Sequence, residues 1–174
     1  MGLRKAACVG IAVCLLAAVP FESLSAAGRP PAKTETFQKA SSFRLRNLEG
    51  KEVRLEDYAG KVILIDFWAS WCPPCQYEVP GLIKVYNQYR ERGFVILGIA
   101  SGDEPSAVRD FVKKRGVPYP ILFGDRTVFE AYKGVYFLPT AFLIDRKGYI
   151  RERLVGPKDQ KTLEQKILPL LEAS

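Results

Sequence analysis

Two cysteines are separated by two prolines in the segment Trp71-Cys72-Pro73-Pro74-Cys75. A β-branched run ends just before them and a helical pattern starts at Pro73, which predicts that Cys72 lies at the N-terminus of a helix. The partial positive charge at that end of a helix stabilises a thiolate and lowers the pKa of a cysteine. Cys72 is therefore the expected attacking thiol, and Cys75, one helical turn further on, is expected to resolve the mixed disulfide.

A structural disulfide and half of a zinc site are the two alternatives for this pair. A disulfide across so short a loop would restrict the unfolded chain very little. The chain has no histidine, and its other cysteines, Cys8 and Cys14, lie in the N-terminal segment, so no further zinc ligands accompany the pair. The absence of histidine also excludes Ser-His-Asp and Cys-His catalysis. We interpret the pair as redox-active, and this chemistry requires no metal or organic cofactor.

The two prolines between the cysteines affect the stability of the thiolate. Proline has no backbone N–H, so neither Pro73 nor Pro74 donates a hydrogen bond to Cys72, and the Cys75 amide becomes the nearest backbone donor. A less stabilised thiolate means a less stabilised reduced form. The pair is therefore predicted to act as a reductant rather than as a strong oxidant.

Residues 1–27 have the pattern of a secretory signal peptide. Two basic residues precede an apolar run from Ala6 to Val19, and small residues end the segment, where cleavage is expected. The apolar run is short for a membrane span, and an uncleaved N-terminal anchor is the alternative. Residues 28–36 are predicted to form a linker, and residues 37–174 a single domain in a periplasmic or other extracytoplasmic location.

Hydrophobic patterning after residue 37 predicts an α/β protein with a mixed sheet. Alternating positions predict a short N-terminal hairpin around Leu48–Lys51, and a second antiparallel pair that turns at Asp145–Gly148. Continuous apolar runs predict buried strands, and 3.6-residue periodicity predicts helices. The expected strands are 61–68, 94–100, 120–123, 140–144 and 149–155, and the expected helices are 73–92, 104–115, 126–132 and 158–172. Parallel βαβ units followed by a ββα ending give a mixed central sheet flanked by helices.

The formal net charge of +7 does not indicate nucleic-acid binding. Basic and acidic residues alternate, as in Arg90-Glu91-Arg92 and Arg151-Glu152-Arg153, which is typical of a solvated surface. We expect a monomer with no nucleic-acid partner.

The segment Asp66-Phe67-Trp68-Ala69-Ser70-Trp71-Cys72-Pro73-Pro74-Cys75 resembles the active-site segment of the thioredoxin superfamily. Glu78 and Pro80 after it, Gly60-Lys61 before it, and Leu138-Pro139-Thr140 with Phe142-Leu143-Ile144-Asp145 are similar to the exported TlpA/ResA-like branch of that superfamily. The resemblance extends from about Phe43 to Leu171. It implies a thioredoxin fold with an added N-terminal β-hairpin and an insertion in the middle.

The resemblance assigns proton transfer to two carboxyl groups. Asp66 resembles the aspartate that takes the proton from the resolving thiol, and burial would raise its pKa as that role requires. Glu78 matches the acidic residue that the ResA-like branch places beside its cysteines. The alternatives are a structural polar residue at a strand end for Asp66 and a solvated carboxylate on a helix face for Glu78.

The resemblance also implies a peptide-binding surface opposite the cysteines. Pro139 would follow a cis peptide bond, and Leu138 would offer its backbone groups to a bound peptide. Trp71 and Phe67 are expected to wall the site, although packing in the core would give the same sequence.

These features together predict an extracytoplasmic thiol-disulfide oxidoreductase. It would reduce disulfides in exported proteins and be re-reduced by a membrane electron donor. The resemblance suggests apocytochrome c, in cytochrome c maturation, as one of several clients, and no residue selects among them. A binding or chaperone module with incidental cysteines is one alternative, against which Asp66, Pro139 and the cysteine pair argue. A thiol peroxidase of the same superfamily is another, but its lone cysteine after a threonine differs from the CxxC motif here.

Overall fold

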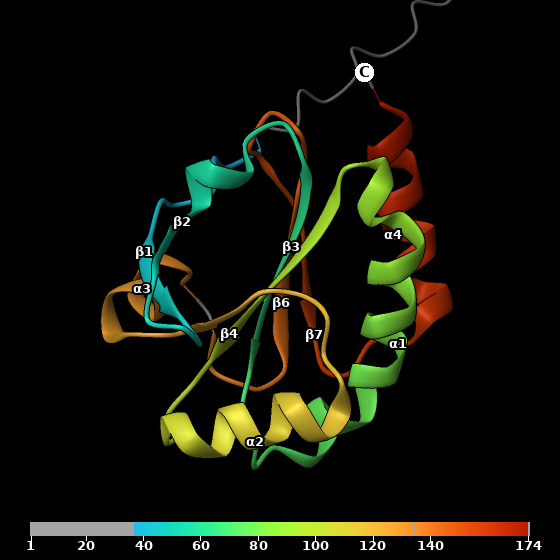
Figure 1. The fold of residues 1–174 in the computed structure, drawn as a ribbon. Helices are drawn as coiled ribbons and strands as arrows, with labels where there is room; N and C mark the ends of the chain where they lie inside the picture. The colour runs from blue at the N-terminus through green and yellow to red at the C-terminus, as the bar shows by residue number, and fades with distance from the viewer. Residues whose placement is uncertain (1–36, 134, 174) are drawn as a thin grey trace, which may run out of the picture. The chain divides into compact units, whose positions relative to one another are not determined.

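A computed structural model describes residues 37–133 and 135–173, so the predicted signal peptide (1–27) and linker (28–36) lie outside the described residues. A mixed sheet runs through this part of the chain in the strand order β2-β1-β5-β4-β3-β6-β7 (Figure 1). The strands are β1 Arg44–Asn47, β2 Glu52–Arg54, β3 Val62–Trp68, β4 Phe94–Ala100, β5 Ile121–Phe123, β6 Thr140–Ile144 and β7 Ile150–Val155. The helices are α1 Pro73–Tyr89, α2 Pro105–Arg115, α3 Arg126–Ala131 and α4 Gln160–Glu172, with 3-10 turns at Leu55–Tyr58 and Arg90–Arg92.

The central strand β3 is buried along its whole length. It pairs in parallel with β4 on one side and antiparallel with β6 on the other. Burial on both faces explains why its sequence is apolar at every position except Asp66 rather than alternating. Because β3 and β4 run in the same direction, their carboxyl ends meet at one edge of the sheet, and α1 starts at this edge with Pro73.

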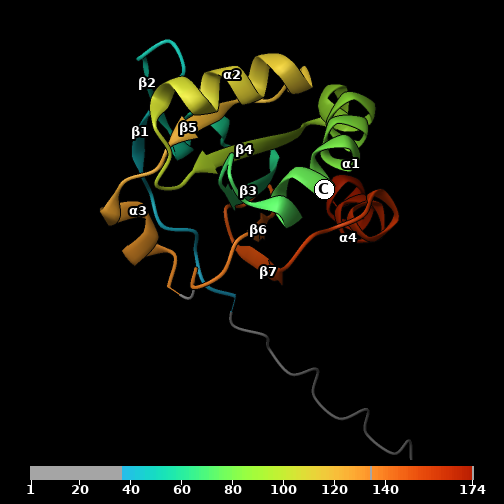
Figure 2. The same ribbon diagram turned by 90° about the horizontal axis from the view of Figure 1, so that it is seen from below.

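The helices divide between the two faces of the sheet. Helices α1, α2 and α4 pack on one face, where Leu82, Val108 and Ile167 are buried. Figure 2 shows these three helices grouped on the same side of the sheet. The other face is covered by α3 and by residues 37–43, which lead into β1. Val128 and Phe43 are buried there. The predicted mixed sheet flanked by helices is confirmed.

The N-terminal hairpin is a continuous part of the main sheet. Its strand β1 pairs antiparallel with β2 and, on the other side, with β5, where Arg46 lies opposite Phe123. Strand β5 in turn pairs in parallel with β4. The α2–β5 unit in the middle of the chain therefore connects the added hairpin to the central strands.

The start of the last helix differs from the expected position. We expected a helix from Lys158, but α4 begins at Gln160 because Asp159 is its N-cap and accepts the backbone N–H of Thr162 at 2.7 Å. Lys158 therefore lies in the loop before α4, and only 5% of its surface is exposed. Within 37–133 and 135–173, none of the helices has the length and apolar character that a membrane crossing requires.

Candidate active site

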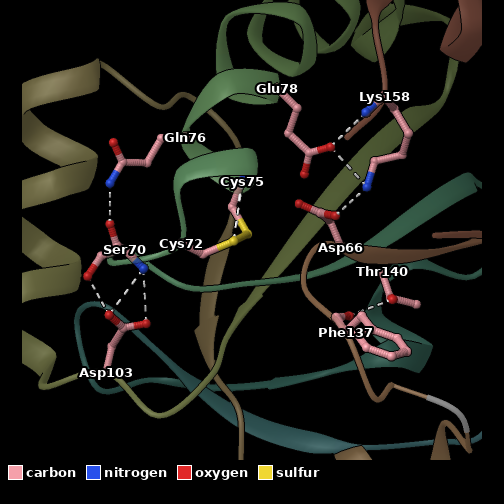
Figure 3. Close-up of a disulfide and its surroundings, with 10 residues drawn as sticks. All are labelled: Asp66, Ser70, Cys72, Cys75, Gln76, Glu78, Asp103, Phe137, Thr140 and Lys158. Atoms are coloured by element: carbon pink, nitrogen blue, oxygen red, sulfur yellow. Dashed lines mark hydrogen bonds and ion pairs between the residues drawn. A yellow bond between two sulfur atoms is a disulfide. The ribbon is translucent and has the colours of Figure 1, made fainter. Parts of the chain in front are cut away.

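Cys72 and Cys75 form a disulfide where β3 is followed by α1, with Cα atoms 5.3 Å apart (Figure 3). Cys72 is the N-cap of α1, as predicted, and Cys75 lies in the first turn. The backbone N–H of Cys75 donates to Sγ of Cys72 at 3.3 Å. This is the backbone donor that remains when Pro73 and Pro74 have no N–H to offer. Both cysteines are buried.

The turn that leads into Cys72 is braced by Asp103, which lies in the loop between β4 and α2. Both carboxylate oxygens of Asp103 accept the backbone N–H of Ser70 at 3.1 Å, and one of them also accepts its hydroxyl group. Gln76 of α1 donates its side-chain amide to the carbonyl oxygen of Ser70 at 2.7 Å. Ser70 is thus held by two side chains from different elements, which fixes the chain just before the cysteine pair.

Three buried ionisable residues meet behind the disulfide (Figure 3). Asp66 of β3 and Glu78 of α1 are 2% and 1% exposed. The ammonium group of Lys158 lies 3.1 Å from Oδ1 of Asp66 and 3.0 Å from Oε2 of Glu78. The backbone N–H of Lys158 also donates to Oε2 of Glu78 at 3.0 Å. The structure therefore brings the two predicted carboxyl groups together and excludes a solvated position for Glu78.

Burial controls the protonation of this cluster. Burial, reinforced by the charge of Asp66, raises the pKa of Glu78 to about 8 although Lys158 opposes this shift. Burial lowers the pKa of Lys158, but Asp66 and Glu78 outweigh that effect, so its pKa is raised overall. Burial and the same two carboxyl groups raise the pKa of Tyr119 well above its ordinary value. At neutral pH the cluster thus contains a charged lysine and a protonated Glu78.

The loop before β6 contains Leu138 and Pro139, the residues for which the family resemblance implies a peptide-binding surface. The Leu138–Pro139 peptide bond is cis, as expected. Because Phe67 pairs with Thr140, this bond lies at the sheet edge where β3 ends. The Pro139 carbonyl oxygen accepts the backbone N–H of Gly156 at 2.9 Å, which ties the loop to the end of β7.

Exposed aromatic side chains lie in both segments that border the site. Trp71, next to Cys72, is 63% exposed, and Tyr136 and Phe137, just before the cis bond, are 81% and 69% exposed. Large apolar side chains that remain in solvent are typical of surfaces that bind another chain. This geometry suits the expected contact of Trp71 and Leu138 with a client peptide, and those contacts stay predictions.

The expectation that Phe67 walls the site is wrong. Phe67 is fully buried, and its ring centroid lies 5.0 Å from that of Phe129 and 5.6 Å from that of Tyr132. These rings belong to the face covered by α3, whereas the cysteines belong to the face covered by α1. Because side chains alternate along a strand, the neighbouring Trp68 takes the position on the cysteine side.

Sequence reasoning missed Lys158 and Asp103. Lys158 follows Gly156-Pro157 and is separated by 80 residues from Glu78, so no local pattern distinguishes it from a solvated lysine. Asp103 had a usable signal, since it follows the buried strand β4 at the edge where parallel strands end and where sites in open α/β sheets form. That position could have placed it beside the cysteines.

The fold and the disulfide at the start of α1 place this protein in the class of thioredoxin-fold proteins that exchange a dithiol for a disulfide. Residues 37–153 match the AhpC/TSA family, and the chain belongs to this family. It is also similar to the thiol-disulfide oxidoreductase ResA of Bacillus cereus, with 34% identity over 140 residues that cover 79% of this chain and 81% of the relative.

Solved structures give the same result. A thiol:disulfide interchange protein of the thioredoxin family from Chlorobium tepidum TLS superimposes with a TM-score of 0.74 and 28% identity, covering 78% of this chain and 97% of the other. A putative thiol:disulfide interchange protein DsbE from Chlorobium tepidum gives a TM-score of 0.72 and 32% identity, covering 78% and 96%. The protein is a thiol-disulfide oxidoreductase, and these relatives favour that activity over a binding module with incidental cysteines.

Proposed function

We propose that this oxidoreductase works outside the cytoplasm and reduces disulfides in other exported proteins. The observation that carries the reducing direction is the hydrogen bonding of Cys72, whose Sγ accepts the Cys75 N–H while Pro73 and Pro74 have none to give. Fewer donors stabilise the thiolate less, and a less stable thiolate makes the dithiol a stronger reductant. The signal-like pattern of residues 1–27 supports the location, either after cleavage or with that segment as an anchor.

The reaction takes place in two exchange steps. The Cys72 thiolate attacks one sulfur of a client disulfide, a mixed disulfide forms, and the other client sulfur leaves as a thiolate. Cys75 then loses its proton and attacks Sγ of Cys72, which closes the disulfide and releases the second client thiolate. A dithiol donor in the membrane reverses these steps to regenerate the reduced pair. Apocytochrome c, whose cysteines must be reduced before haem attachment, is the client class that we propose to test first.

Mixed-disulfide trapping tests the reducing function and the client class together. In cells that produce the full chain, Cys75→Ser should accumulate mixed disulfides with exported proteins through Cys72, because the resolving thiol is missing. Cys72→Ser should trap none and should lose insulin reduction in vitro. Lys166→Met, which changes a lysine paired with Glu152 away from the cysteines, is the matched control and should behave as wild type. Trapping of cytoplasmic proteins alone would contradict the proposed location.

A further inference from the structure

Lys158 holds one oxygen of the Glu78 carboxyl group from two directions. Its backbone N–H and its Nζ both lie 3.0 Å from Oε2. The same Nζ also lies 3.1 Å from Oδ1 of Asp66, so a single residue fixes the relative positions of both buried carboxyl groups. Figure 3 shows Lys158 on the opposite side of the two carboxyl groups from the disulfide.

The second oxygen of the Glu78 carboxyl group, Oε1, is buried without a hydrogen-bond partner among the described residues. An oxygen that accepts two N–H groups has no room for a proton of its own, whereas an unpaired carboxyl oxygen can carry one. A buried polar atom without a partner calls for an explanation, and a role in catalysis is one of the common ones.

We propose that Lys158 is a positioning residue that occupies Oε2 of Glu78 and thereby fixes the exchangeable proton of the buried carboxyl pair on Oε1 of Glu78. This proposal rests on the dithiol exchange described above and assigns its proton carrier. Glu78 lies one helical turn from Cys75 on α1, so its carboxyl group is on the same side of the helix as the resolving sulfur. Asp66, the other carboxyl group to which the sequence resemblance assigns proton transfer, then serves as the second ion-pair partner of Lys158.

The proton balance of the exchange is simple. When an external thiolate attacks Sγ of Cys72 in the disulfide, a new S–S bond forms and Cys75 leaves as a thiolate. The Cys75 thiolate takes the proton from Oε1 of Glu78, which becomes a carboxylate. In the reverse direction the Glu78 carboxylate takes the proton back as Cys75 attacks the mixed disulfide, so neither direction needs a further proton carrier.

The groups that face Glu78 come from four parts of the chain. They are Asp66 of β3, Lys158 of the loop before α4, Tyr119 of the segment before β5, and Cys75 of α1 itself. The pKa of Tyr119 is raised, so it stays neutral through the working range. The raised pKa of Glu78, about 8, agrees with a proton held on this residue at neutral pH.

Infrared spectroscopy of the oxidised full chain tests the location of the proton without any client. Wild type should show a carboxylic acid C=O band near neutral pH that disappears as the pH rises through about 8. Glu78→Gln should lack this band at every pH. Asp66→Asn should keep it with a midpoint at lower pH, because the charge of Asp66 helps to raise the pKa of Glu78. A band that persists in Glu78→Gln and is lost in Asp66→Asn would place the proton on Asp66 and overturn the proposal.

Substitution of Lys158 tests the positioning role. Lys158→Met removes the ammonium group, so the band should persist to a pH higher by about one unit, because an opposite charge at this distance lowers a carboxyl pKa by at least that much. Lys158→Arg keeps the charge, so the pH midpoint of its band should lie close to that of wild type. The control Lys166→Met, in α4, should leave the midpoint unchanged. An unchanged midpoint in folded Lys158→Met would refute the role assigned to Lys158.

Kinetics separate this proposal from the function on which it rests. The rate constant for reduction of the disulfide by dithiothreitol should fall ~10²-fold in Glu78→Gln, as for loss of a general acid. In Lys158→Met, the pH profile of this rate constant should shift to higher pH by the same amount as the infrared midpoint. If trapping of exported clients succeeds but neither rate nor profile changes, the proposed function stands and the assignment of the proton to Glu78 fails.

Discussion

The cysteine pair has an unusual hydrogen-bond environment at the level of single residues. Cys72 caps α1, but the two residues that follow it are prolines, so the Cys75 N–H at 3.3 Å is the backbone donor to its sulfur. The helix dipole favours the thiolate and the missing donors disfavour it. The balance between these two effects sets both the pKa of Cys72 and the reduction potential.

Pro73→Gly tests this balance directly. The glycine restores a backbone N–H at the first position of α1, so the pKa of Cys72 should fall and the reduction potential should become less negative. Both quantities are measured on the full chain, by pH-dependent alkylation and by equilibration with glutathione. Pro105→Gly, at the same position of α2, is the matched control and should change neither. If Pro73→Gly also leaves both values unchanged, the argument from the prolines is wrong.

Glu78 links the stability of the oxidised protein to pH. Its pKa is about 8 in the folded state against an ordinary value of 4.5, so the folded state binds more protons than the unfolded state between these values. The associated stability is fully present below pH 4.5 and is lost as the pH rises through about 8. Glu78→Gln removes this dependence and should be more stable than wild type at pH 9 by a few kcal/mol.

Urea unfolding of the oxidised wild type and Glu78→Gln at several pH values measures this difference. The advantage of the variant should shrink as the pH falls toward 4.5 and vanish below it, where wild-type Glu78 is protonated in both states. Equal losses of stability in wild type and variant between pH 5 and pH 9 would show that Glu78 is not the source of the pH dependence.

Side chains from neighbouring elements hold the turn before Cys72 in place through hydrogen bonds. The turn before α1 is held by Asp103, whose loop follows β4, and by Gln76 of α1. Asp103→Asn keeps the size of the side chain, but its amide has only one oxygen to accept the backbone N–H and the hydroxyl group of Ser70. We expect a loss of about tenfold in kcat/KM for insulin reduction, since small displacements of reacting groups slow a reaction strongly. Asp110→Asn, an exposed change on α2, is the control and should keep wild-type activity. Wild-type activity in Asp103→Asn would show that Asp103 does not brace the site.

Most elements of this fold could be predicted from the sequence because their patterns are local. β3, apart from Asp66, and β4 are apolar runs, and the helix after the cysteines follows directly from its periodicity. Lys158 could not be predicted for two reasons. The sequence around it is equally compatible with the first turn of α4, and its partners Asp66 and Glu78 lie 92 and 80 residues away. The packing of α4 against α1 and β3 brings these groups together.

At the scale of the whole molecule, the N-terminal hairpin closes one side of the sheet far from the cysteines in strand order. Leu45 of β1 is buried against the face covered by α3. Leu45→Ala should therefore lower the free energy of unfolding by about 2–4 kcal/mol, as for other buried leucines. Arg44→Ala, an exposed change on the same strand, should stay within about 0.5 kcal/mol of wild type.

The reduction potential should be the same in both hairpin variants, because the hairpin contributes no group to the disulfide environment. Urea unfolding measures the free energy of unfolding, and equilibration with glutathione measures the reduction potential. A shift of the potential in Leu45→Ala that matches its loss of stability would show that hairpin and site are coupled.

The equilibrium reduction potential of the Cys72–Cys75 disulfide in the wild-type protein tests the central claim most directly. The structure predicts a reducing pair, with a potential closer to the ~−270 mV of thioredoxin than to the ~−120 mV of the strongest thiol oxidants. A potential near the oxidising end would contradict the account, because it would mean that the Cys72 thiolate is strongly stabilised despite the two prolines.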